Sequence, residues 1–145
     1  MNEALPWLLA LQLLATLSLV GLIWTIQIVH YPLFSRVGED GFVGYQEAHM
    51  RAIGPLVGPL MLVEALVVVV LAVMRPDALS LLGLALLVVI WVSTAFIQVP
   101  CHRILTERFD ERAHRRLVSS NWIRTVAWTL RGLVSLFMVP FLTGS

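Results

Sequence analysis

Two long stretches of this chain contain no charged side chain. The first lies between Glu3 and Arg36, and the second lies between Asp77 and Arg103. Each exceeds the roughly 20 apolar residues that an α-helix needs to cross about 30 Å of hydrocarbon. Within lipid the backbone must satisfy its own hydrogen bonds, and a single segment can do so only as a helix. The two stretches therefore predict two membrane-spanning helices.

Two further apolar stretches carry ionisable residues. The stretch 52–74 contains only Glu64, and the stretch 117–142 contains only Arg124 and Arg131. The composition, 59% hydrophobic and 13% charged, is also typical of a membrane protein. We predict one all-α domain over residues 1–145, an integral membrane four-helix bundle. Its spans are expected near residues 5–30, 55–74, 79–100 and 120–142.

The arginines are distributed unevenly between the two ends of the predicted bundle. The loops 31–54 and 101–119 hold seven arginines, whereas the short turn at the other end holds only Arg75. Because loops rich in arginine stay cytoplasmic, we expect both loops inside and both termini outside, in a bacterial inner (plasma) membrane. Apolar residues at helical spacing also predict short amphipathic interfacial helices within 38–53 and 103–119, with a break at Gly54-Pro55.

Each half of the chain ends its first apolar stretch with a glutamine followed by a histidine. These residues are Gln27 and His30 in the first half and Gln98 and His102 in the second. The loops that follow contain His49 and His114. Polar groups are costly in lipid, so the membrane-embedded ones are expected to face the bundle interior. This repeated pattern, Gln27/His30 and Gln98/His102, is called the Gln–His echo below. It fits two duplicated helical hairpins, and it also fits chance similarity between apolar helices.

Glu64 and Arg131 lie near the middle of the predicted membrane. Each is nine or ten residues from the cytoplasmic end of its span, which corresponds to about 13–15 Å at the helical rise. An isolated charge at that depth costs several kcal/mol. We therefore predict that Glu64 and Arg131 form a structural ion pair at the floor of a polar pocket. The alternative is a direct role for either residue in ligand binding or proton transfer.

The other buried polar residues are expected to line this pocket. Arg124 can hold an anionic or enolate oxygen while a histidine moves a proton. The predicted catalytic residues are His30, His102 and Arg124, and the predicted substrate-binding residues are Gln27, Gln98, Asn121, Trp91 and Trp128.

Two alternatives to a catalytic pocket stay open. Histidines are common ligands of haem and metal ions, although no motif in the chain requires either cofactor. The candidate ligands are His30, His49, His102 and His114. The polar residues can also simply satisfy one another and hold the four helices in register.

The last predicted span opens with Asn121-Trp122-Ile123-Arg124. A four-span protein of this size with Asn-x-x-Arg at that place resembles the anthrone-oxygenase-like family of small membrane proteins. The resemblance implies oxygenation of an activated aromatic carbon without an obvious cofactor. The glutathione-using membrane transferases are a second four-span comparison. Glu111-Arg112 and Asn121 are loosely similar to their Arg/Asn-rich motif, but they precede a different helix.

The leading hypothesis is a small membrane oxidoreductase or oxygenase-like enzyme. It would act on an apolar or aromatic small molecule in a His/Gln/Arg pocket that opens to the cytoplasmic side. The alternative is a non-enzymatic haem-, metal- or lipid-binding membrane subunit that works through a partner protein. The expected partners are the lipid bilayer and the small ligand, with a homo-oligomer or a membrane protein partner left open. A net charge of +1 gives no reason to expect nucleic acid.

Overall fold

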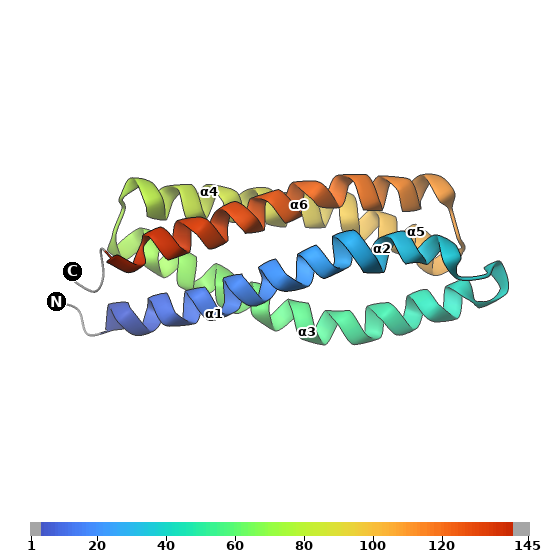
Figure 1. Cartoon of the computed structure of the whole chain (residues 1–145), viewed down its shortest axis with the longest axis horizontal. Coiled ribbons are helices and arrows are strands. Elements are labelled where there is room, and N and C mark those ends of the chain that lie inside the picture. The colour runs from blue at the N-terminus through green and yellow to red at the C-terminus, as the bar shows by residue number, and fades with distance from the viewer. Residues whose placement is uncertain (1–3, 141–145) are drawn as a thin grey trace.

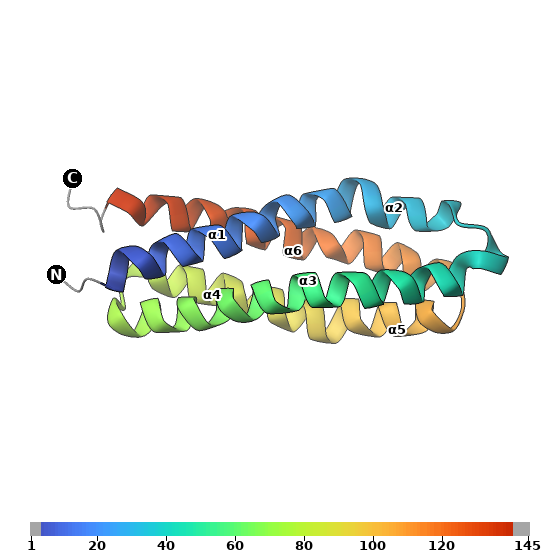
Figure 2. The same ribbon diagram turned by 90° about the horizontal axis from the view of Figure 1, so that it is seen from below.

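The chain folds into four long helical stretches that lie side by side (Figures 1 and 2). The computed structural model describes residues 4–140. The first stretch comprises α1 (Ala4–Thr25), the π-helical segment η1 (Ile26–His30), α2 (Tyr31–Leu33) and the 3₁₀ turn η2 (Phe34–Arg36). The second is α3 (Glu39–Met74), the third comprises α4 (Ala78–Ser93), the π-helical segment η3 (Thr94–Gln98) and α5 (Val99–Glu107), and the fourth is α6 (Glu111–Phe137). Each stretch packs against the next, and α6 closes the bundle against α1. The predicted all-α class is confirmed for the described residues, which form no strand.

The two loops predicted at the arginine-rich end are almost entirely helical. Residues 31–36 continue the first stretch, and residues 39–53 begin α3. The predicted break at Gly54-Pro55 is wrong, because α3 runs through Pro55 and Pro59 without ending. Each proline removes only one backbone donor, and packing against neighbouring helices carries the helix past it.

The predicted interfacial helices are therefore not separate elements. The one expected within 38–53 is the first part of α3. The one expected within 103–119 is divided by a turn at 108–110 into the end of α5 and the start of α6. The turn forms because Arg108 has extended backbone and Asp110 caps the following helix.

Aspartates begin two of the helices. Asp77 Oδ1 accepts a hydrogen bond from the Ser80 backbone N–H at 2.9 Å, and Asp110 Oδ1 accepts one from the Ala113 N–H at 2.8 Å. A helix start leaves its first backbone donors without partners, and these carboxylates satisfy one of them in each helix. The α3–α4 and α5–α6 turns are fixed in this way.

Replacing Asp77 by Ala is expected to lower the free energy of unfolding by about 1 kcal/mol at neutral pH, as loss of an N-cap does. The bond from the Ser80 N–H lowers the pKa of the Asp77 carboxyl, so the fold stabilises its ionised form. This contribution is present above the ordinary pKa of 3.8 and is lost as the pH falls through the lowered folded-state pKa. Unfolding in mixed micelles at several pH values measures the difference.

The matched control is Asp77→Asn, which keeps a capping oxygen and removes the charge. Its cost should be smaller, and the pH-dependent part of the Asp77 contribution should be absent from it. A difference between wild type and Asp77→Ala that stays constant on acidification would contradict the assignment.

Three of the described helical stretches are long and apolar enough to cross a membrane, namely Ala4–Arg36, Glu39–Met74 and Ala78–Glu107. The fourth predicted span, 120–142, is largely α6, which is not among them; positions 141–142 lie outside the described residues. Its hydropathy is lowered by polar side chains that are all buried inside the bundle, at 0–7% exposure: Asn121, Arg124, Arg131 and Ser135. The exposed residues of α6 include Trp122, Ile123, Val126, Leu130 and Leu133.

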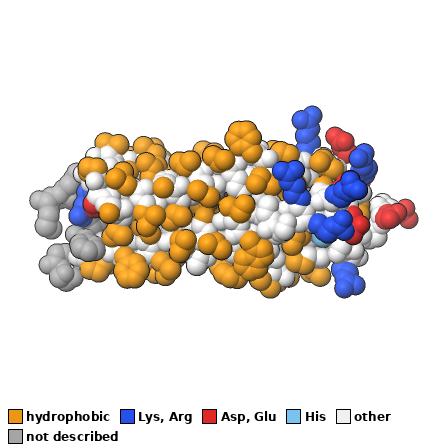
Figure 3. Space-filling view, turned by 90° about the horizontal axis from the view of Figure 1, so that it is seen from above, with side chains coloured by type: hydrophobic (Ala, Val, Ile, Leu, Met, Phe, Trp, Pro, Cys, Tyr) orange, Lys and Arg blue, Asp and Glu red, His pale blue; other side chains and the backbone are white. Residues whose placement is uncertain are grey.

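Charged side chains gather at the ends of the bundle and leave its middle apolar, on the face that Figure 3 shows. Most lie at the end that contains the turns 37–38 and 108–110. The two ends of the described chain lie at the opposite end, beside the α3–α4 turn (Figure 1). The buried polar residues can therefore be placed relative to an arginine-rich end of the bundle.

Both π-helical segments stand at the same distance before a proline. η1 begins six residues before Pro32, and η3 begins six residues before Pro100. In each, a backbone N–H bonds the carbonyl five residues back: Tyr31 to Ile26, and Val99 to Thr94. A π-turn inserts one residue and rotates the side chains that follow, and such turns are frequent at functional sites. When the two halves of the chain are aligned on these prolines, His30 corresponds to Gln98. The Gln–His echo instead matches His30 with His102, so the two alignments differ. The duplication of the hairpins stays a prediction.

Candidate functional site

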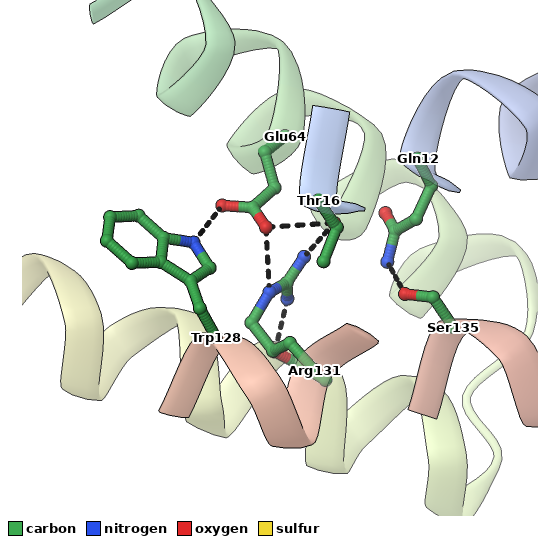
Figure 4. Close-up of polar contacts among 7 residues, drawn as sticks. Gln12, Thr16, Glu64, Trp128, Arg131 and Ser135 are labelled. Carbon is green, nitrogen blue, oxygen red and sulfur yellow. Dashed lines mark hydrogen bonds and ion pairs between the residues drawn. The ribbon is translucent and has the colours of Figure 1, made fainter. Parts of the chain in front are cut away.

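A fully buried ion pair joins α3 to α6 inside the bundle (Figure 4). Arg131 Nε donates to Glu64 Oε1 at 3.0 Å, and both side chains are 0% exposed. The predicted pairing of these two residues is thus confirmed. Glu64 also accepts from the Thr16 hydroxyl at 2.9 Å and from Trp128 Nε1 at 3.1 Å. Arg131 Nη1 donates to the Gly83 carbonyl at 2.6 Å. With both charges paired and further bonded, this layer fits a structural role.

A second buried arginine lies two helical turns away on the same face of α6. Arg124 is 7% exposed, and its Nε donates to Asn121 Oδ1 at 2.9 Å. Its Nη1 and Nη2 lie 3.4 Å from Thr94 Oγ1 and the Tyr31 hydroxyl. Within residues 4–140, no ion pair joins Arg124 to a carboxylate. A buried charge without a counter-ion is costly. Arg131 has Glu64 as its counter-ion, whereas Arg124 has no carboxylate among its described contacts.

Arg124 is held in place from behind. Asn121 Nδ2 donates to Gln27 Oε1 at 2.9 Å, and Gln27 Nε2 donates to the Val118 carbonyl at 3.1 Å. The amide of Asn121 therefore has a fixed orientation, with its oxygen toward the guanidinium. Gln27 and Asn121, predicted as ligand-binding, act in this geometry as supports of Arg124.

Tyr31 and His102 form a hydrogen-bonded pair beside Arg124. The Tyr31 hydroxyl is 2.9 Å from His102 Nε2, and Gln46 Nε2 is 2.8 Å from His102 Nδ1. When Gln46 donates to Nδ1, neutral His102 carries its hydrogen on Nε2 and donates to the Tyr31 oxygen. Arg124 donates to the same oxygen. The phenolic hydrogen of Tyr31 is then available to a ligand.

The other histidines have different surroundings. His30 Nε2 is 2.8 Å from His49 Nδ1, and the ring centroids of His49 and His102 are 5.6 Å apart. His114 Nε2 is 2.8 Å from the Tyr31 carbonyl oxygen, so it braces the helix that carries Tyr31. The part of the chain from 4 to 140 contains no group of three or more His, Cys, Asp or Glu placed to hold a metal ion. His102 has hydrogen-bond partners on both ring nitrogens and would have to give one up to ligate haem or a metal, whereas the bond of His30 to His49 uses Nε2.

A cavity of about 330 Å³ opens beside Arg124, between α1, α3, η3 and α6. Its polar lining consists of Tyr31, Thr94, Gln98, His102 and Arg124. The remaining walls are apolar or glycine and include Leu19, Ile23, Met50, Val57, Met61 and Trp128. A small polar cluster in a mostly apolar cavity is the general form of a small-molecule site.

The structure brings some predicted site residues into this cavity and not others. Gln98, His102, Arg124 and Trp128 line it. His30 lines a separate groove of about 500 Å³ between α1 and α3, with His49. Trp91, predicted as a wall, does not line the cavity and is 38% exposed on α4.

Tyr31 and Gln46 are among the residues of the site that are missing from the predicted set. Both fall in 31–54, which the charges and the Gly54-Pro55 step assign to a loop. The available signal was the spacing of Phe42, Gln46 and His49, which repeats at four and three residues, and all three are buried. That spacing indicates one inward helix face.

Comparisons with known proteins identify no relative, since the chain matches no family model, no curated protein and no solved structure. The resemblance carried by Asn121 and Arg124 therefore stays an expectation.

Proposed function

We propose that this chain is an integral membrane protein of four spans, with α6 as the fourth. The apolar length of the first three stretches supports this, and so does the burial of the polar side chains of α6 among them. The arginine-rich end would be cytoplasmic by the positive-inside rule, in a bacterial inner membrane, which places both termini outside. In that orientation the cavity lies toward the cytoplasmic half of the membrane.

The proposed activity is binding of a small apolar molecule that carries an anionic oxygen, such as a carboxylate, phenolate or enolate. One observation carries this proposal: Arg124 is buried, faces an apolar cavity and has no carboxylate among its described contacts. A ligand oxygen at the guanidinium would supply the missing counter-charge. The Tyr31 hydroxyl would donate a second hydrogen bond to the same oxygen.

The enzymatic form of the proposal adds a proton transfer. When the Gln46 amide is turned so that its oxygen accepts from His102 Nδ1–H, His102 Nε2 becomes an acceptor. A ligand with an acidic C–H or O–H bond would then give its proton to the Tyr31 oxygen while the Tyr31 hydroxyl proton moves to His102 Nε2. The electron pair of that bond would remain on the ligand as an enolate or phenolate, whose oxygen Arg124 stabilises. Oxidation of such an anion by dioxygen, which the family resemblance implies, stays a prediction. His102 fits the role of base better than His30, because only His102 lines the cavity.

The test uses two probes that share the anthracene ring and differ in the group at C9, the anionic 9-anthracenecarboxylate and the neutral 9-anthracenemethanol. Quenching of tryptophan fluorescence in purified protein reports binding, since Trp128 lines the cavity. The carboxylate is expected to bind at least about tenfold more tightly. Equal affinity for the two probes, or no saturable binding of either, would contradict the proposed function.

Replacing Tyr31 by Phe is expected to weaken binding of 9-anthracenecarboxylate by about tenfold, or about 1.4 kcal/mol. The ring and its packing stay, and only the hydroxyl between His102, Arg124 and the ligand is lost. Tyr45→Phe is the matched control, because Tyr45 lies in the separate groove and not in this cavity. Fluorescence titration measures both variants, and equal losses in the two would assign the effect to something other than the hydroxyl at the site.

A further inference from the structure

The cavity reaches the outer surface of the bundle between α3 and α5. Gly54 and Gly58 of α3 and Val99 of α5 line it, and among them Gly54 is exposed and Val99 is 54% exposed. The inner lining is closed by buried residues, Arg124 at 7% and Trp128 at 2% exposure. The opening therefore points sideways from the bundle axis.

The α3 side of this opening has an unusual sequence. Gly54-Pro55 and Gly58-Pro59 repeat at a spacing of four, which places both glycines on one helix face. A Cβ atom added at either glycine would meet nothing within 4 Å. Both positions therefore present open space where they line the cavity. Glycines inside a helix cost stability relative to alanine, so packing does not explain their presence here.

Both walls of the opening are also weakened helices. Pro55 and Pro59 remove two backbone donors from α3 at the level of the opening. On the other wall, η3 is π-helical and Pro100 follows it closely. Segments with fewer backbone hydrogen bonds open at lower cost than regular helices.

The surface outside the opening is apolar. Leu62, one helical turn beyond Gly58 on α3, is 62% exposed, and Val92 and Phe96 on the other side are 50% and 74% exposed. If the bundle spans a membrane, this surface contacts lipid chains and not water. A molecule passing through the opening would come from the bilayer interior.

We propose that the cavity takes its ligand sideways from the bilayer, through the opening between α3 and α5 whose width Gly54 and Gly58 set. The ligand class is then an apolar acid dissolved in the lipid, which enters with its acidic oxygen toward Arg124. As a statement about the ligand this rests on the proposed function. The opening itself can be tested without any ligand.

The test is thiol labelling of full-length protein in lipid nanodiscs, in a Cys101→Ser background. Gly58→Cys places a thiol in the cavity, and Gly21→Cys places one on the exposed side of α1, where a Cβ also meets nothing within 4 Å. The lipid-dissolved reagent is pyrenylmaleimide, and the water-soluble one is a charged maleimide. Gly58→Cys is expected to react with the lipid-dissolved reagent in preference to the charged one.

Adding Gly54→Leu should slow the reaction of Gly58→Cys with pyrenylmaleimide by about tenfold, because the new side chain fills the opening. The reaction of Gly21→Cys is the control and should not change. Gly54→Ala should act in the same direction to a smaller extent, and it serves if the leucine variant does not fold. Preferential labelling of Gly58→Cys by the charged reagent, or no effect of Gly54→Leu and Gly54→Ala, would overturn the proposed opening.

Ligand kinetics separate the two proposals. With 9-anthracenecarboxylate added in vesicles, Gly54→Leu should slow association and dissociation by a similar factor, about tenfold, and change the Kd much less. If labelling behaves as expected but wild type binds no probe, the proposed function fails and the opening stands. If wild type binds the probe and Gly54→Leu changes neither labelling nor association, the opening fails and the proposed function stands.

Discussion

Glu64→Gln and Arg131→Gln are each expected to lower the free energy of unfolding by about 3–5 kcal/mol. Each leaves the other charge fully buried with no counter-ion, since both side chains are 0% exposed. The double variant Glu64→Gln/Arg131→Gln should be less destabilised than either single variant, because it buries no charge. Unfolding by sodium dodecyl sulfate in mixed micelles measures all three.

The exposed pair Glu47–Arg51 on α3 provides the matched control. Its atoms are 3.6 Å apart, and its side chains are 52% and 71% exposed. Glu47→Gln should therefore change the free energy of unfolding by less than about 1 kcal/mol. Additive losses in the Glu64/Arg131 cycle would reject a coupled pair and reopen a direct role for either residue.

Sequence alone was sufficient for the ion pair because the cost of a buried charge depends mainly on depth. The helical rise gives that depth once the spans are known, and only Glu64 and Arg131 come out at the same level with opposite sign. The helix order and the arginine-rich end follow from equally local signals. The inward face of α6 follows from the i+3 and i+4 spacing of its polar residues.

The cavity was beyond the same reasoning. Gly54-Pro55 is a loop signal in a soluble protein, and here it lies inside α3 and lines an opening. A missing side chain creates space only in relation to the helix opposite, which a pattern along one helix does not show. Tyr31 was missed for a related reason, because η1 rotates the residues after it, and the pattern assigns them to a loop.

The Gln–His echo was only partly informative about the site. Gln27 and Gln98 both contact α6, through Val118 and Ser120, whereas His30 and His102 both contact α3. The echo therefore marks two similar pairs of contacts. It does not mark one shared site, because Gln98 and His102 from the second half line the cavity, whereas Gln27 and His30 from the first half do not.

Arg124→Gln is expected to reduce the affinity for 9-anthracenecarboxylate by about 100-fold or more, as loss of a buried charge partner does in other binding sites. The affinity for neutral 9-anthracenemethanol should change by less than about threefold, because the apolar walls are unaltered. Fluorescence titration of both probes measures the contrast. A parallel loss for the two probes would show that Arg124 shapes the cavity and does not bind an anion.

The stability of Arg124→Gln is expected to change in the opposite direction to that of Arg131→Gln. Arg131→Gln breaks a satisfied pair, but Arg124→Gln removes a buried charge that has no carboxylate partner among residues 4–140. The free energy of unfolding of ligand-free protein should then stay the same or rise in Arg124→Gln, while it falls in Arg131→Gln. The two arginines lie seven residues apart on one face of one helix, so each is the control for the other. Equal destabilisation by the two substitutions would make Arg124 a structural residue, whereas opposite effects would show that its charge is kept for a ligand at the expense of the fold.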